Sequence, residues 1–204
     1  GHRPGGGGEA VRHAASLAAG RAAAELLGEL AGSDALAVAA TREASDEWLR
    51  AALTARVAEM RAQGTTTVEV KSGYGLTVAD EERALRLAAE VTDEVTYLGA
   101  HVVPAEARED RAGYVSLVTG EMLAACAPHA RWVDVFCEPH SPHAFTGDES
   151  REVLETGRAA GLGLRVHGNQ LGEGPGVKLA VEQGAASVDH VNYLTDDDVE
   201  ALQA

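Results

Sequence analysis

The hydrophobic pattern changes character near Ser45. Beyond it, segments with helical spacing of apolar residues alternate with short apolar and β-branched runs. These runs have little polar alternation, which is typical of strands buried on both faces, as in a parallel sheet. The alternation of helix and strand predicts consecutive βαβ units, and therefore an α/β fold with a parallel sheet.

The pattern predicts five strands and a helix after each of them, preceded by one long helix with Ser45 as its N-cap. Thr77 is a second expected N-cap, with Asp80 or Glu81 completing a capping box. The expected strands cover residues 65–70, 94–101, 132–138, 163–168 and 187–191. The expected helices cover residues 45–63, 77–91, 114–127, 148–161 and 176–185, and a last one opens at Thr195.

Residues 1–40 differ from the rest, because they are rich in glycine and alanine and offer few large apolar side chains to bury. We therefore expect two parts, an irregular N-terminal segment (1–40) and an α/β domain (41–204).

Each expected strand runs into polar or ionisable residues at its carboxyl end. The first strand leads to Lys71 and Tyr74, and the third leads to Glu138. The other three end at histidines, namely His101, His167 and His190. Five strands fit an open doubly wound sheet or part of a closed barrel. In a (β/α)₈ barrel the carboxyl ends meet at one active site, so this convergence favours a partial barrel with about five of the eight strands.

Composition and charge narrow the function classes. The chain has 204 residues, 45% of them hydrophobic, and a net charge of −15. A strongly acidic chain without a basic stripe argues against nucleic-acid binding. No apolar run is long enough for a membrane span, and no segment resembles a signal peptide. Two cysteines are too few for a disulfide framework, so we expect a reducing, cytoplasmic setting.

Two other motifs are weaker candidates. "GEGPG" at 172–176 looks like a phosphate loop, but it lacks the GxGxxG spacing and is better interpreted as the start of a helix. His140 and His143 could bind a metal, yet the prolines around them favour a simple loop.

Several segments together resemble one family. "TTTVEVKSGYGL", "YLGAHVVP", "VDVFCE", "VHGNQL" and "SVDH" occur in this order, and the match runs from about Ala39 onward. This set resembles imidazolonepropionase, a metal-dependent amidohydrolase of histidine breakdown. The resemblance implies a (β/α)₈ barrel, a small-molecule substrate, one zinc or iron ion and a homodimer. It also implies hydrolytic opening of 4-imidazolone-5-propanoate to N-formimidoyl-glutamate.

The resemblance also implies roles for individual residues. His167 matches a metal ligand, and His190 matches the active-site histidine that handles protons. Tyr74, His101 and Gln170 match positions that contact the substrate. Arg3, in Gly1-His2-Arg3, aligns over three residues with a segment whose arginine holds the substrate carboxylate.

The family's His-x-His motif would lie upstream of Gly1, and its metal-binding aspartate would lie beyond Ala204. We therefore expect an internal fragment that is inactive by itself. Two alternatives remain open: a non-catalytic fragment or binding remnant, and another metal-dependent amidohydrolase that acts on a cyclic amide. A phosphate-binding α/β enzyme would need a proper phosphate loop, which "GEGPG" does not supply.

Overall fold

The computed structural model describes residues 33–203 and has an α/β architecture built on one parallel sheet. The sheet has five strands in the order β1-β2-β3-β4-β5, so every strand lies beside its neighbour in the sequence. This order is that of a barrel wall, and the chain forms a partial (β/α)₈ barrel, as the sequence predicts. The strands are β1 (Val70–Lys71), β2 (Val95–Ala100), β3 (Trp132–Cys137), β4 (Gly163–Gly168) and β5 (Ser187–His190).

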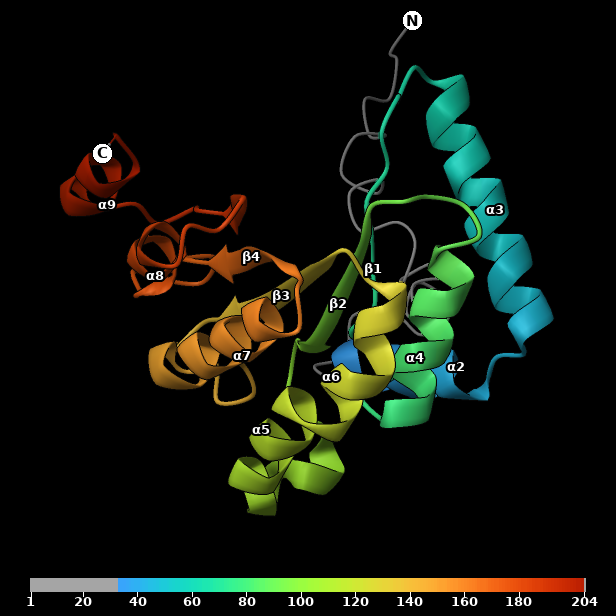
Figure 1. Ribbon diagram of the computed structural model, residues 1–204, viewed down its shortest axis with the longest axis horizontal. Helices are drawn as coiled ribbons and strands as arrows, with labels where there is room; N and C mark the ends of the chain where they lie inside the picture. The colour runs from blue at the N-terminus through green and yellow to red at the C-terminus, as the bar shows by residue number, and fades with distance from the viewer. Residues whose placement is uncertain (1–32, 204) are drawn as a thin grey trace, which may run out of the picture.

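Helices follow the strands and cover one face of the sheet, and Figure 1 shows α4 to α7 gathered on that side. The α-helices are α2 (Ser33–Glu43), α3 (Asp46–Ala62), α4 (Val78–Ala88), α5 (Arg111–Thr119), α6 (Glu121–Cys126), α7 (Gly147–Ala159), α8 (Gly176–Glu182) and α9 (Asp196–Gln203). Two short 3₁₀ turns are η1 (Ala105–Asp110) and η2 (Ala127–His129). None of the helices in the described range has the length and apolar character that crossing a membrane requires.

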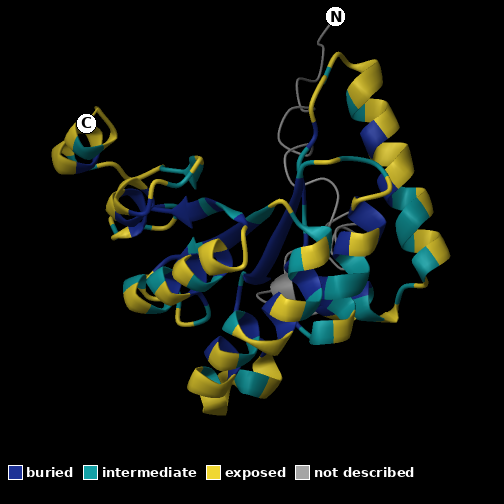
Figure 2. Ribbon diagram, viewed as in Figure 1, coloured by how far each residue is buried: buried dark blue, intermediate teal, exposed yellow. Residues whose placement is uncertain are grey.

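The two faces of the sheet have different chemistry. Val133 and Val135 of β3 are completely buried against the helix side, where a Cβ on Gly157 of α7 would collide with Val133. Asp134 and Phe136 alternate with them and face the inside of the barrel. Figure 2 shows the buried strands and the exposed outer surfaces of the helices. The apolar core therefore lies between sheet and helices, and the polar groups lie inside the barrel.

Two helix starts have the predicted caps, and a third has a cap that the sequence analysis did not include. The Ser45 hydroxyl accepts from the Trp48 amide, and the Thr77 hydroxyl accepts from the Asp80 amide. Thr146 and Glu149 form a complete capping box at α7, a signature of helix starts.

Two local expectations are wrong in detail, and a third is decided between its two alternatives. The helix expected over 114–127 breaks at Gly120 into α5 and α6, because Gly120 adopts a non-helical conformation. Of the expected first strand (65–70), only Val70 lies in β1, which covers Val70–Lys71 and pairs with β2 alone. Of the two expected partners of Thr77, Asp80 contacts the cap: its amide donates to the Thr77 hydroxyl, and that hydroxyl donates to the Asp80 carboxylate. The Glu81 carboxylate instead binds backbone amides of the 73–76 loop. The boundary at residue 40 stays a prediction.

Candidate functional site

The carboxyl ends of the strands bring four of the predicted site residues together in two pairs. The ring centroids of His167 and His190 lie 5.1 Å apart, at the ends of β4 and β5. Those of Tyr74 and His101, after β1 and β2, lie 4.8 Å apart in an edge-on arrangement. Phe136 joins the pairs, because its ring lies 5.9 Å from His101 and its Cα is the register partner of His167. The predicted residues thus line one edge of the sheet.

His101 is oriented by the backbone of the neighbouring loop. Its Nδ1 lies 2.9 Å from the carbonyl oxygen of Gly73. A carbonyl oxygen only accepts, so Nδ1 carries a hydrogen and donates it to Gly73. The loop after β1 therefore fixes the orientation of the His101 imidazole.

His190 has an unusual backbone. Its φ is 73°, and that of Val191 is 48°, in the left-handed region that non-glycine residues seldom adopt. The amide of Val191 donates to the carbonyl of Gly168 at 3.2 Å, which ties this strained turn to β4. Strained backbone of this kind is concentrated at functional sites.

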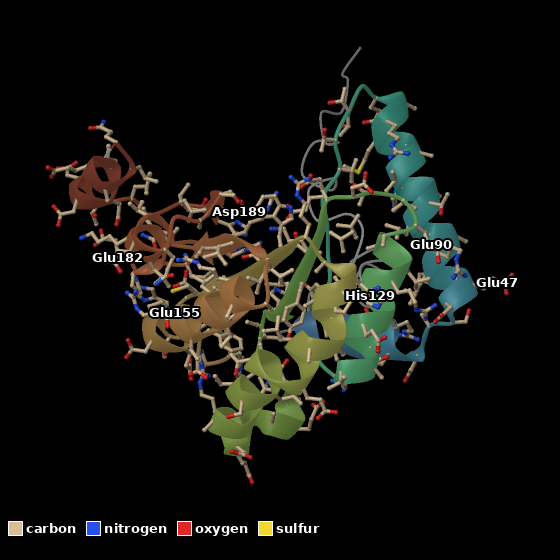
Figure 3. The ribbon with its side chains drawn as sticks, viewed as in Figure 1. Glu47, Glu90, His129, Glu155, Glu182 and Asp189 are labelled. Carbon is tan, nitrogen blue, oxygen red and sulfur yellow. The ribbon has the colours of Figure 1, made fainter. Side chains whose placement is uncertain are left out.

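A charged group lies inside the barrel, in contact with His167. Nζ of Lys71 lies 2.7 Å from Oδ2 of Asp134 and 2.8 Å from Oδ2 of Asp189. Nδ1 of His167 lies 2.9 Å from the same Asp134 oxygen, without the alignment of a hydrogen bond. Figure 3 shows Asp189 across the sheet from Glu155 of α7, on the side that the helices leave open.

The charges in this group stabilise one another. Burial alone would raise the pKa of Asp134, but the attraction of His167 and Lys71 holds that pKa well below its ordinary value. Burial alone would lower the pKa of Lys71, but attraction to Asp134, Glu69 and Asp189 raises it. Lys71 and Asp134 are therefore ionised at neutral pH.

The same group contains the candidate metal ligands. Ligand atoms of Asp134, His167 and Asp189 lie within 4.8 Å of one another, and no other such set is found in residues 33–203. However, the Lys71 ammonium already neutralises both carboxylates at hydrogen-bond distance. A divalent ion held by all three groups would therefore have to compete with this ammonium for both carboxylates.

Two buried glutamates, which the sequence did not single out for such a role, hold the loops at this edge. Glu81 accepts from the amides of Gly73, Gly75 and Leu76 at 2.8–2.9 Å. Glu138 accepts from the amides of Gln170 at 3.0 Å and Leu171 at 2.8 Å. Glu138 was predicted at this edge, but its partners in the Gln170 loop are 32 and 33 residues away in sequence. No local pattern reveals such partners.

The remaining candidates lie elsewhere. His140 binds the carbonyl of Glu173 through Nε2 at 2.7 Å, and His143 lines a cleft with Arg42 and Val103. The group of metal-ligand type in the described range contains neither histidine, in agreement with a loop role. Arg3 lies outside the described residues.

Parallel strands that bring histidines together at their carboxyl ends are typical of a (β/α)₈-barrel enzyme. No family model matches the chain. Sequence comparison shows similarity to imidazolonepropionases. The chain is 63% identical over 172 residues to that of Streptomyces coelicolor, covering 84% of this chain and 43% of the relative. It is 57% identical over 196 residues to that of Salinispora arenicola, covering 93% of this chain and 49% of the relative. The imidazolonepropionase of Streptomyces avermitilis is 63% identical over 172 residues, covering 84% of this chain and 41% of the relative.

These matches confirm the predicted resemblance. The chain is homologous to part of imidazolonepropionase, and it spans less than half the length of the curated relatives it matches.

Proposed function

We propose that this chain is part of a hydrolase that opens the cyclic amide of 4-imidazolone-5-propanoate to give N-formimidoyl-glutamate. One observation carries the proposal: His167 and His190 face each other at the carboxyl edge of a sheet homologous to that of imidazolonepropionase. A small-molecule substrate suits such an edge, where barrel enzymes bind their ligands.

We assign His167 as the ligand of one divalent metal, zinc or iron, together with ligands outside the described residues. When bound, such an ion polarises a carbonyl group and makes a water molecule more acidic. Asp134 lies 2.9 Å from Nδ1 of the His167 ring, so Nε2 would be the atom that holds such an ion.

The side chains then divide the remaining work. His190 takes a proton from the attacking water and returns one to the ring nitrogen as the C–N bond breaks. The oxygen of the water becomes part of the new carboxylate. Tyr74, His101 and Gln170 orient the ring, and the Gly73 carbonyl holds the His101 imidazole through Nδ1. Arg3 holds the propanoate carboxylate.

The test is direct. The full-length protein that carries this segment is incubated with 4-imidazolone-5-propanoate, and the product is identified by mass spectrometry. We expect metal-dependent formation of N-formimidoyl-glutamate. If a metal-loaded protein leaves this compound intact but opens another cyclic amide, the alternative of a different amidohydrolase holds.

A non-catalytic role is the second candidate for the chain by itself. The observation in its favour is that Lys71, and not an open position, lies between the carboxylates of Asp134 and Asp189. For the complete protein we propose a homodimer in the cytoplasm, without a nucleic-acid or membrane partner. Size-exclusion chromatography with light scattering tests the homodimer.

A further inference from the structure

Two glutamates, Glu81 and Glu138, are completely buried beside the carboxyl edge of the sheet. Burying a carboxylate is costly unless hydrogen bonds compensate for the lost water. In the described part of the chain, the hydrogen bonds found for the Glu138 carboxylate all come from backbone amides. An apolar side chain of similar size would fill the same space at lower cost. What the carboxylates add over an apolar side chain is a set of hydrogen bonds that fix the backbone of the neighbouring loops.

Glu81 holds the loop that carries Tyr74. The amides of Gly73 and Gly75, on either side of Tyr74, both donate to its carboxylate. Leu76 also donates, at 2.8 Å, and has a left-handed φ of 56°. The same loop supplies the Gly73 carbonyl that orients His101. One carboxylate thus fixes the backbone under two predicted substrate contacts.

Glu138 holds the loop that carries Gln170. Its Oε2 accepts from the amides of Gln170 and Leu171, while Oε1 accepts from that of His140 at 3.3 Å. Consecutive amides directed at one oxygen form an anion-binding nest of the backbone. Asn169, just before them, has a left-handed φ of 53°. The carbonyl of Gln170 accepts from the Asn192 side chain at 3.3 Å, so its backbone is held at both ends.

We infer that Glu81 and Glu138 are positioning residues, which hold Tyr74 and Gln170 in the arrangement that binds the substrate through hydrogen bonds to the loop backbone. This inference rests on the proposed function, because that function gives Tyr74 and Gln170 their roles. Neither glutamate touches the substrate, and each acts on one loop.

The first experiment measures amide hydrogen exchange on the full chain by NMR. In Glu138→Ala, the amides of Gln170 and Leu171 exchange at least about tenfold faster, while those of Gly75 and Leu76 keep their rates. In Glu81→Ala the pattern reverses. Glu173→Gln and Glu82→Gln, at glutamates that are not among the buried ones, serve as matched controls and leave both loops unchanged. Unchanged exchange in both alanine variants would overturn the inference.

The second experiment is a pair of double-mutant cycles on turnover of 4-imidazolone-5-propanoate by the full-length protein. Glu138→Ala lowers kcat/KM by about 10- to 100-fold, the cost of a misplaced contact. In a Gln170→Ala background the same change costs less than threefold, whereas in a Tyr74→Phe background it keeps its full cost. Glu81 couples to Tyr74 in the same manner and not to Gln170. If the losses of kcat/KM were additive for Glu138 with Gln170 and for Glu81 with Tyr74, the inference would be contradicted.

Conservative variants separate loop positioning from loss of folding. Glu138→Gln and Glu81→Gln keep one acceptor oxygen, so they should fold, and their exchange and kinetic effects should be intermediate. If an alanine variant does not fold by circular dichroism, the glutamine variants provide the same two readouts. Failure of the proposed function has a separate signature, because the unmodified protein would then leave the substrate intact. The exchange experiment still decides whether the glutamates hold the loops.

Discussion

The ammonium group of Lys71 lies 2.7 Å from the carboxylate of Asp134, across the inner face of the barrel. Asp134 is completely buried, and the side chain of Lys71 is 18% exposed. A second bond from Lys71 reaches Asp189, on the opposite edge strand of the sheet. One cation therefore links β1, β3 and β5 below the candidate site.

Lys71→Met should lower the free energy of unfolding by about 2–4 kcal/mol, because it leaves a buried carboxylate without its cation. Lys178→Met is the matched control, since the Lys178–Asp197 pair is 47% and 77% exposed and should contribute less than about 1 kcal/mol. Urea unfolding of the full chain measures both. Equal effects of the two variants would contradict the prediction. A higher free energy of unfolding in the double variant Lys71→Met/Asp134→Asn than in Lys71→Met would support it.

This interior pair also marks the limit of what the sequence reveals. The five strands and most helices could be predicted, because burial on both faces and capping residues leave local patterns. His167 and His190 could be placed together, because both follow parallel strands. Lys71 and its partners are 63 and 118 residues apart, so no local pattern records their contact. Glu81 was expected only as an alternative to Asp80 at the Thr77 cap, and the sequence does not show that its carboxylate binds the preceding loop.

A second prediction concerns acid stability at the start of α7. The hydrogen bond from Arg111 lowers the pKa of Glu149 to about 2, from an ordinary value of 4.5. Since the folded pKa is lowered, the stabilisation is present above pH 4.5 and is lost as the pH falls towards about 2. Glu149 is about one-fifth exposed, so solvent screening reduces the effect to about 1–3 kcal/mol.

Urea unfolding between pH 5 and pH 2 should therefore be less pH-dependent in Glu149→Gln than in the unmodified chain. Glu182→Gln removes an exposed partner of Arg151 and should leave the pH dependence unchanged. Parallel curves for the unmodified chain and Glu149→Gln would contradict the prediction.

The 204-residue chain alone should retain no zinc or iron after dialysis and should show no turnover of 4-imidazolone-5-propanoate. The physical reason is that His167 alone is too small a ligand set, and Lys71 already neutralises the carboxylates beside it. Metal analysis by mass spectrometry after dialysis measures this. One tightly held ion per chain would point to Asp134, His167 and Asp189 as a real site, and the Lys71→Met variant would then hold it more tightly.

The last prediction separates the two neighbouring histidines in a complete barrel. Their rings lie 5.1 Å apart, so either imidazole is close enough to an ion at this edge to be its ligand. We expect different roles. The resemblance implies a complete set of metal ligands that does not include His190, and the reaction still needs a group that exchanges protons near neutral pH. An imidazole ordinarily titrates near about pH 6.5, which suits that task. His190→Asn should keep the metal and lower kcat by roughly 10²- to 10⁴-fold. His167→Asn should lose the metal. Measuring metal per chain and turnover on both variants decides between the roles: a metal-free His190→Asn protein would make His190 a ligand, and a metal-loaded His167→Asn protein would remove His167 from the metal site.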